Sequence, residues 1–237
     1  GDVYKRQHQD DEVLSMGAFI RQSVDNGCRV HVVLCTDGSR SWVRTELADG
    51  LTCSFHEGSH AYSLSEEEFV SSRDDEFFES CQALGVSPLD VCIDGGRSRD
   101  GQLDVDAAKA IISKYLAQYP NAVVCTMSPM VGLSQHSDHR ALGNAALELY
   151  REGSIVDLRL FVESYNVGDF QRCNPGLGLG ETASSGDASA LLAACDAYSM
   201  WNPPANRYAI GYHSVGGDFD AFSGSGYVSY WHAASSL

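Results

Sequence analysis

An apolar run at residues 122–127, with the sequence AVVCTM, constrains the fold of this chain more than any other segment. It is typical of a strand that is covered on both faces, as strands are in the middle of parallel sheets. Parallel neighbours can be joined only by long crossover connections, which are usually helices. The run therefore predicts a parallel sheet with helices packed against it.

Helical and strand-like patterns alternate along the rest of the chain, as expected for an α/β fold. Helices are expected at 13–26, 66–84, 105–119, 138–152 and 187–200. Strands are expected at 29–35, 89–93 and 158–162, with strand-like ends around 208–210 and 227–231, whereas 42–65 reads as a loop. The sequence shows no repeat and no clear linker, so residues 8–237 are expected to form one domain, which suits a length of 237 residues.

The first seven residues, GDVYKRQ, do not read as a buried strand, and the chain has no initiator Met. We expect residues 1–7 to be a doubtful or truncated start, from which a first strand or a signal peptide is missing. A cytoplasmic location is favoured, with export through such a missing signal peptide as the alternative.

Composition excludes several classes of partner. The chain carries 16 Lys and Arg against 32 Asp and Glu, a formal charge of −16. Nucleic acids and anionic membrane surfaces are bound largely through Lys and Arg, so neither is an expected partner. No run approaches the roughly 18 apolar residues that a membrane span needs. The eight cysteines form no C-x-x-C pair and are expected to be mostly reduced and structural.

Two short clusters of metal-binding residue types stand far apart in the sequence, HQDDE at 8–12 and HSDH at 136–139. Imidazole nitrogen and carboxylate oxygen are zinc ligands, and a catalytic zinc needs three of them plus an open position. The second cluster follows the 122–127 strand, at the sheet edge where parallel α/β folds bind ligands. The first would reach the same edge if a strand precedes it. From the residues alone, a metal site and a pair of polar helix starts both remain open.

The order of the motifs resembles the N-acetylglucosaminyl-phosphatidylinositol de-N-acetylase family, also called PIG-L or LmbE-like. Its His-Pro-Asp-Asp-Glu, Thr-x-Gly, Arg-x-x-Glu and His-x-Asp-His motifs correspond to 8–12, 36–38, 73–76 and 136–139, with the Leu-Gly helix end at 84–85. The resemblance runs from residue 8 to about 149, with a weaker echo at 207–214. Gln9 and Ser137 stand where the family commonly has Pro, and neither position supplies a family ligand.

The resemblance implies a three-layer α/β/α, Rossmann-like fold with a mostly parallel sheet. It also implies Zn²⁺, with Fe²⁺ as another possible divalent metal, held by His8, Asp11 and His139. The reaction implied is removal of an acetyl group from an N-acetylated amino sugar or its conjugate, by attack of metal-bound water on the amide.

The resemblance also assigns roles to Asp10, His136 and Arg73, and the surrounding residues suggest roles for Asp138 and Asp100. Asp10 is the general base, and His136 stabilises the oxyanion or protonates the leaving amine, with Asp138 as the partner that orients His136 and keeps it protonated. Arg73 matches the family arginine that contacts the polar substrate, although a surface residue paired with Asp or Glu explains it equally well. Asp100 is a candidate ligand of sugar hydroxyls, and its Asp-Gly turn offers a structural alternative.

Two other classes of function stay open. One is a metal-dependent hydrolase of an ester or phosphoester bond, and the other is a non-catalytic carbohydrate-binding relative. A phosphoester enzyme more often has two metals and a basic pocket, which this acidic chain does not favour. The particular N-acetylated substrate and the oligomeric state do not follow from the sequence.

Some residues are expected to be structural or solvated. Tyr212 and His213 could line the cleft, but a structural role is favoured. His56 and His60 are expected to be solvated in a loop, with a second metal as the lesser alternative. The Gly-rich segment 174–186 lacks the strand that a dinucleotide motif follows, so it is expected to be a flexible loop over the cleft.

Overall fold

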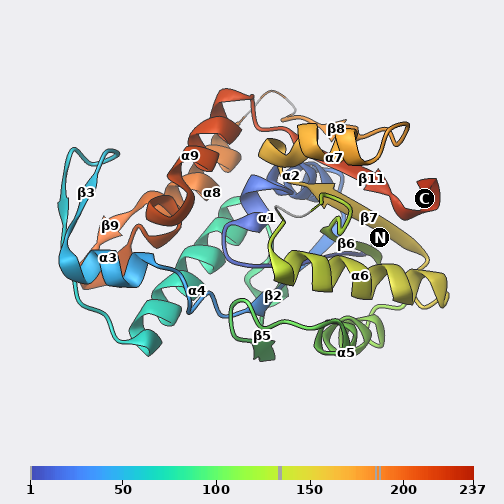
Figure 1. The fold of residues 1–237 in the computed structure, drawn as a ribbon, viewed down its shortest axis with the longest axis horizontal. Coiled ribbons are helices and arrows are strands. Elements are labelled where there is room, and N and C mark those ends of the chain that lie inside the picture. The colour runs from blue at the N-terminus through green and yellow to red at the C-terminus, as the bar shows by residue number, and fades with distance from the viewer. Residues whose placement is uncertain (1, 133–134, 185, 187) are drawn as a thin grey trace.

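The structure is a computed structural model that describes residues 2–132, 135–184, 186 and 188–237. Strands and helices alternate through much of the chain, so the expected α/β class is confirmed (Figure 1). Within the described residues, none of the helices combines the length and the apolar character needed to span a bilayer.

The main sheet has seven strands in the order β5-β2-β1-β6-β7-β11-β8. The neighbours from β5 to β7 are all paired in parallel, whereas β11 runs antiparallel to both β7 and β8. The strands are β1 (Asp2–Gln7), β2 (Arg29–Thr36), β5 (Val91–Ser98), β6 (Val123–Met127), β7 (Asp157–Val162), β8 (Gly180–Thr182) and β11 (Ser229–Ala233).

Alternate residues of the central strands enter two different hydrophobic clusters. Val33 and Val124 pack with α5 (Val105–Leu116) and α6 (Ser137–Arg151). Leu34 and the other side chains that point to the opposite face of the sheet pack with a second group of helices. These are α2 (Gly17–Asp25), α4 (Glu66–Ala83), α8 (Ser189–Ser199) and α9 (Ile210–Gly224). Because successive side chains of a strand point to opposite faces, each face of the sheet has its own apolar surface.

Strand β1 corrects the expectation that the strand before the first cluster is missing. Its backbone pairs with β2 from Asp2↔Arg29 to Gln7↔Leu34, and with β6 from Val3↔Val123 to Lys5↔Cys125. The expectation was based on the polar side chains of this segment. Strand pairing depends on backbone N–H and C=O groups, which polar residues also supply.

The segment expected to be a loop at 42–65 is also more ordered than its sequence suggested. It contains α3 (Val43–Asp49) and a hairpin of β3 (Leu51–Cys53) and β4 (Gly58–His60). The expected helix at 13–26 is divided into α1 (Asp11–Leu14) and α2. The expected helices at 66–84, 105–119 and 138–152 correspond closely to α4, α5 and α6.

The last third of the chain differs more from expectation. The described part of the expected 187–200 helix is α8, while residue 187 lies outside the described residues. Strand β8 lies within the segment expected to be a flexible loop, of which residue 185 is likewise outside the described residues. The sequence did not reveal α9. The smaller elements are α7 (Val167–Cys173), β9 (Trp201–Asn202) and β10 (Arg207–Tyr208).

Close packing of α6 on the end of β6 should make Gly143 sensitive to substitution. A Cβ at Gly143 would lie 2.5 Å from the Met127 carbonyl oxygen and 2.9 Å from the Pro129 backbone nitrogen. We expect Gly143→Ala to lower the free energy of unfolding by about 1–3 kcal/mol, measured by urea denaturation. Gly217→Ala in α9 is the control, because its Cβ would meet nothing within 4 Å. Equal stability of the two variants would contradict this packing.

Candidate active site

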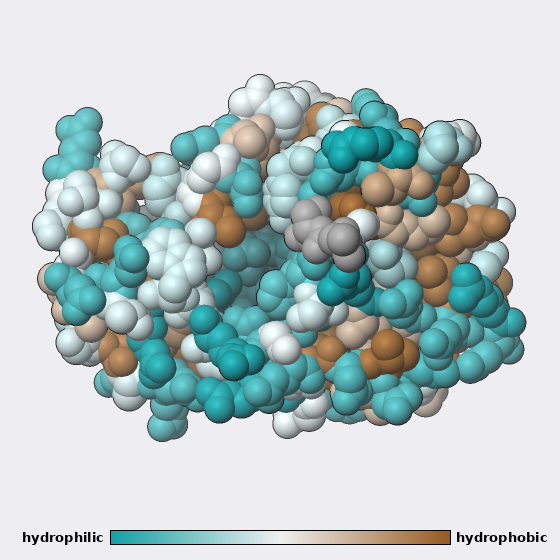
Figure 2. Space-filling view, in the orientation of Figure 1, coloured by the Kyte–Doolittle hydropathy of each residue, from teal (hydrophilic) through white to brown (hydrophobic). Residues whose placement is uncertain are grey.

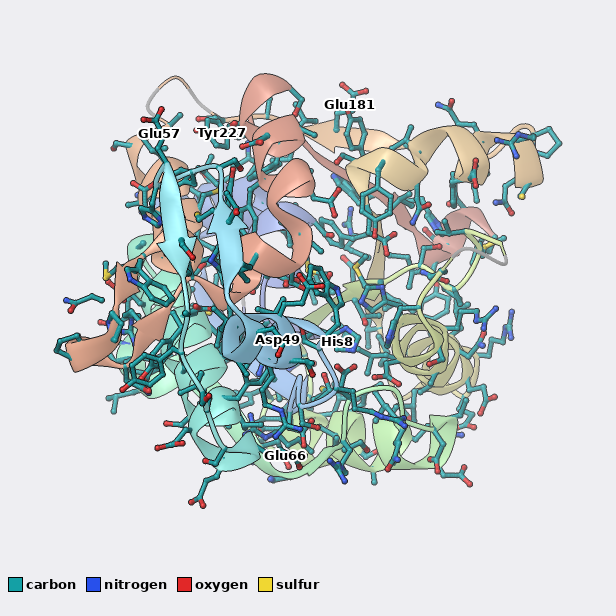
Figure 3. The ribbon with its side chains drawn as sticks, turned by 60° about the vertical axis from the view of Figure 1, so that its left-hand side comes forward. His8, Asp49, Glu57, Glu66, Glu181 and Tyr227 are labelled. Atoms are coloured by element: carbon teal, nitrogen blue, oxygen red, sulfur yellow. The ribbon has the colours of Figure 1, made fainter. Side chains whose placement is uncertain are left out.

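The two polar clusters meet at the carboxyl ends of the parallel strands. His8 follows β1 directly, and α6, which begins after the N-cap residue His136, carries His139 in its first turn. His8 Nδ1 lies 3.0 Å from His139 Nε2, although 131 positions separate the two residues. In Figure 3, His8 lies near the centre of the view, between α3 and α6.

Three donor atoms converge on one point in this cluster. His8 Nδ1 lies 3.0 Å from His139 Nε2 and 3.4 Å from Asp11 Oδ2. His139 Nε2 lies 2.8 Å from Asp11 Oδ2. Tetrahedral zinc with bonds of about 2.0–2.1 Å places its nitrogen and oxygen ligands about 3.3 Å apart. The three side chains therefore fit a divalent metal of this size with small adjustments, and they are the three that the family resemblance nominated.

In both rings, the nitrogen that points away from the three-donor cluster (the outer nitrogen) faces a carboxylate. His139 Nδ1 is 2.9 Å from Glu163 Oε1, and His8 Nε2 is 3.0 Å from Asp138 Oδ2. When these nitrogens carry the protons, the inner nitrogens keep their lone pairs for a metal. Sequence reasoning missed Glu163, yet its place directly after β7, at the ligand-binding edge of the sheet, was a usable signal.

Asp138 orients a different ring from the one expected. Its Oδ2 lies 3.0 Å from His8 Nε2 but 3.9 Å from His136 Nδ1. Backbone N–H groups of Gly101 and Leu103 also donate to this carboxylate, over 2.8 and 3.1 Å. These bonds turn the side chain away from His136, so the structure makes Asp138 a partner of His8.

Asp10 and Arg73 form a buried ion pair beside the three donors. Arg73 Nη2 donates to Asp10 Oδ2 and to the Gln9 carbonyl, each over 3.2 Å. Arg73 is only 4% exposed, so it is not the surface residue that one interpretation expected. Burial raises the pKa of Asp10 to about 7, with Asp11 adding to the shift and Arg73 opposing it.

The backbone conformation at Asp10 lets the adjacent side chains of Asp10 and Asp11 point in different directions. Asp10 has a φ of 89°, which is uncommon for a residue with a side chain. Its N–H donates to Glu12 Oε2 over 3.1 Å and to the Tyr198 hydroxyl over 2.8 Å, and these bonds stabilise the turn. Glu12, in the first turn of α1, is thus part of the support beneath the site.

The electrostatics of the cluster favour positive charge. Burial alone would lower the pKa of His8, but hydrogen bonds with Asp11 and Asp138 raise it to about 9. The same balance raises the pKa of His139 well above its ordinary value, chiefly through Asp11. The pKa of Asp11 is lowered because the two imidazoles outweigh its burial. A divalent cation would satisfy the same carboxylates.

His136 and Asp100 stand at the edge of the cluster. The His136 ring centroid is 4.6 Å from that of His8, and Asp100 Oδ1 is 3.6 Å from His8 Nε2 and 3.9 Å from His136 Nε2. Burial, together with His8 and His139, lowers the pKa of His136, whereas the carboxylates of Asp138 and Asp100 act in the opposite direction.

A cavity of about 340 Å³ opens onto these groups. Figure 2 shows this face of the molecule hollowed near its middle, with hydrophilic residues inside the hollow. Besides the residues already described, the cavity is lined by Arg40, Ser41, Trp42, Tyr165, Ser214 and Val215. Trp42 and Tyr165 are 54% and 62% exposed, so both present aromatic surface to solvent. Sequence reasoning singled out neither.

The remaining candidates lie elsewhere. His213 faces His60, with Nε2 and Nδ1 2.8 Å apart, whereas its neighbours Ser214 and Val215 line the cavity. His60 is 3% exposed, so the expectation that it is solvated is wrong, while His56 is exposed as expected.

Comparison with known proteins identifies the family of this chain. The sequence profile of the GlcNAc-PI de-N-acetylase family, PIG-L, matches residues 7–150, so the chain belongs to this family. Among curated proteins, none matches significantly.

Solved structures share the fold at low identity. A deacetylase of the teicoplanin biosynthetic pathway is 19% identical with a TM-score of 0.67, and the match covers 98% of this chain and 96% of that one. N,N'-diacetylchitobiose deacetylase from Pyrococcus horikoshii is 19% identical with a TM-score of 0.53 over 98% and 82%. The 4-carboxy-2-hydroxymuconate hydratase of Pseudomonas putida is 16% identical with a TM-score of 0.52 over 98% and 94%. The fold alone therefore does not fix the reaction.

The contact between Glu163 and His139 predicts an effect on metal affinity. We expect Glu163→Gln to weaken zinc binding by about 10–100-fold, because a neutral amide supports the ring less well than a carboxylate. Competition against a chromophoric chelator measures this affinity. Glu181→Gln, at an exposed position of β8, is the control and should bind zinc like the unmodified protein. Unchanged affinity in Glu163→Gln would contradict the orienting role.

Proposed function

We propose that this protein is a metal-dependent de-N-acetylase that acts on an N-acetylated amino sugar or its conjugate. The observation that carries the proposal is the convergence of His8, Asp11 and His139 on one point, with Asp10 beside them on the same cavity. Membership of the PIG-L family supports it, as does the presence of deacetylases among the structural neighbours. We further propose that the scaffold is the three-layer, Rossmann-like fold with a mostly parallel sheet.

The proposed metal site uses His8, Asp11 and His139 as ligands, with zinc as the first candidate and Fe²⁺ as the second. A divalent cation bound there would polarise the amide carbonyl and make water more acidic. The two-imidazole, one-carboxylate set leaves a position for substrate or water, as hydrolytic metal sites do. Glu163 and Asp138 hold the two imidazoles in place for this role.

Asp10 is proposed as the general base. Its carboxylate takes a proton from the water whose oxygen forms a bond to the acetyl carbon. When the C–N bond breaks, the same carboxyl group returns the proton to the departing nitrogen, so acetate and a free amine are released. Arg73 fixes the carboxylate beside the cavity, because its guanidinium donates to Asp10 and to the Gln9 carbonyl.

His136 is proposed to stabilise the oxyanion as a neutral hydrogen-bond donor. The Asp138 backbone N–H donates to His136 Nδ1 over 3.3 Å, which leaves the ring proton on Nε2. That nitrogen lies 3.9 Å from Asp100 Oδ1, and both residues line the cavity. A hydrogen bond from this nitrogen to the carbonyl oxygen would become stronger as negative charge develops on that oxygen.

The cavity lining supports a polar, ring-shaped substrate. Trp42 and Tyr165 offer flat aromatic surfaces, while Asp100 and Arg40 offer hydrogen-bonding groups beside them. Small-molecule sites commonly combine aromatic walls with a few placed polar groups that fix orientation. We propose that the amino sugar stacks on an aromatic ring and that Asp100 accepts from its hydroxyls.

Acetate release from a panel of N-acetyl sugars tests this function. We expect the metal-loaded protein to release acetate and a free amine from at least one of N-acetylglucosamine, its disaccharides and its glycosyl-inositols. A chelator should abolish the activity, and added zinc should restore it. Cleavage of ester or phosphoester substrates in place of amides would favour the other hydrolase, and sugar binding without turnover would favour the non-catalytic relative.

Asp10→Ala provides the matched control for this assay. The variant should keep its metal, because Asp10 lies outside the proposed ligand set, but lose about 10²–10⁴-fold in turnover with the general base. Full activity in Asp10→Ala would contradict the assignment of the base.

A further inference from the structure

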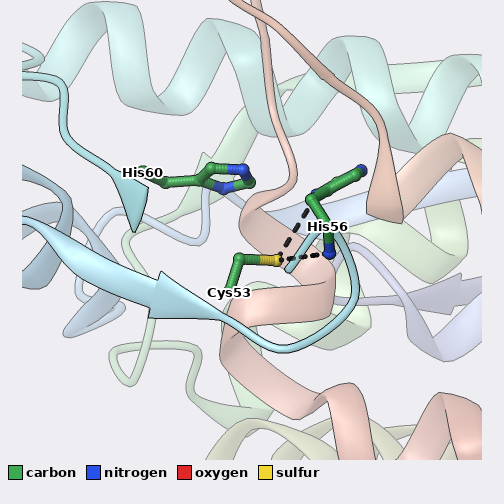
Figure 4. Close-up of side chains that lie close together, drawn as sticks. All are labelled: Cys53, His56 and His60. Atoms are coloured by element: carbon green, nitrogen blue, oxygen red, sulfur yellow. Dashed lines mark hydrogen bonds between the residues drawn. The ribbon is translucent and has the colours of Figure 1, made fainter. Parts of the chain in front are cut away.

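A second group of metal-binding side chains lies in the β3–β4 hairpin, apart from the candidate active site. Cys53 ends β3, His56 lies in the turn, and His60 ends β4 (Figure 4). The spacing C-x₂-H-x₃-H brings a thiol and two imidazoles into eight residues, which is the short spacing seen in zinc-binding loops. The hairpin's antiparallel pairing places Cys53 opposite Gly58, so the turn between them is tight.

The donor atoms of this hairpin are already close together. Cys53 Sγ lies 3.3 Å from His56 Nδ1 and accepts the His56 backbone N–H over 3.4 Å. One donor atom from each of Cys53, His56 and His60 lies within 4.8 Å of the other two. Tetrahedral zinc with one thiolate places its ligands about 3.3–3.6 Å apart. A small inward rotation of these side chains would therefore suffice for binding.

Neighbouring side chains hold the imidazole ring of His60 in one orientation. His60 is buried, it stacks on Trp201 with ring centroids 3.6 Å apart, and its Nδ1 lies 2.8 Å from His213 Nε2. The His56 ring, in the hairpin turn, has its centroid 5.0 Å from that of His60. Cys53 is 1% exposed, whereas His56 is exposed and leaves one side open to solvent.

We propose that Cys53, His56 and His60 bind a second zinc ion, with His213 positioning the His60 ring. The set shares no residue with the candidate active site. A thiolate with imidazoles selects a borderline-soft divalent metal such as zinc over calcium or magnesium.

A metal bound at the hairpin would stabilise one wall of the cavity. The hairpin follows α3, whose N-cap residue Trp42 lines the cavity. His213 belongs to the first turn of α9, directly before the cavity residues Ser214 and Val215. Helix α9 is kinked at Val215, where φ and ψ are −140° and 38°. The second zinc thus stabilises the hairpin next to this wall and takes no part in the chemistry.

Cobalt substitution distinguishes the two sites, because only the hairpin site contains sulfur. We expect the metal-free, reduced protein to bind two Co²⁺ per chain, one of which gives a sulfur-to-cobalt charge-transfer band in the near ultraviolet. His139→Ala should bind one Co²⁺ and keep the band. Cys53→Ser should also bind one Co²⁺ but lose the band. These outcomes separate a failure at the hairpin from a failure at the candidate active site.

Two further variants keep the test decisive. Cys173→Ser removes an exposed thiol outside the hairpin and should leave the band unchanged. His56→Ala alters an exposed side chain that should not be needed for folding, and it should weaken Co²⁺ binding at the hairpin by at least about tenfold. The proposal is overturned if the unmodified protein shows no charge-transfer band. It is also overturned if the band survives unchanged in Cys53→Ser or, should that variant not fold, in His56→Ala.

Discussion

The parallel pairing of β1 between β2 and β6 is the constraint on which the candidate active site depends. His8 follows directly from β1, and the loop after β6 leads to His136 and α6. Because these two strands are neighbours and run in the same direction, their carboxyl ends lie side by side. The imidazoles of His8 and His139 are therefore brought within 3.0 Å of each other by the sheet itself.

Charge compensation explains why such a dense group of ionisable side chains can be buried. Asp11 lies between two imidazoles, each of which has a carboxylate on its outer side, Asp138 for His8 and Glu163 for His139. Asp10 is paired with Arg73 instead. Buried charges are tolerated when they are paired and hydrogen-bonded, and every charged group in this cluster has such a partner. The arrangement also leaves the inner nitrogens and one oxygen of Asp11 facing a common point.

The sequence predicted the parts of the fold that follow from periodicity and from apolar runs. The buried strand at 122–127 and the helices α4, α5 and α6 were of this kind. It did not predict β1, because the polar residues of that strand carry no apolar pattern. The hairpin at 51–60 was missed for a similar reason, since two three-residue strands are too short to show a period.

Within the site, the sequence predicted which residues meet but not how each side chain is directed. The motifs identified His8, Asp11 and His139, which the structure brings together. Proximity in sequence suggested that Asp138 supports His136, whereas backbone donors from Gly101 and Leu103 hold its carboxylate toward His8. Likewise, no local pattern distinguishes a surface Arg73 from one buried against Asp10. Such directions depend on contacts between segments that are distant in the chain.

The proposed function depends most on a metal held by His8, Asp11 and His139. Its most direct test is an anomalous difference map, recorded at the zinc absorption edge, from crystals grown with zinc. We expect a peak about 2 Å from His8 Nδ1, Asp11 Oδ2 and His139 Nε2. The absence of a peak at this point under saturating zinc, or a peak held instead by Asp100, His136 and Asp138, would contradict it.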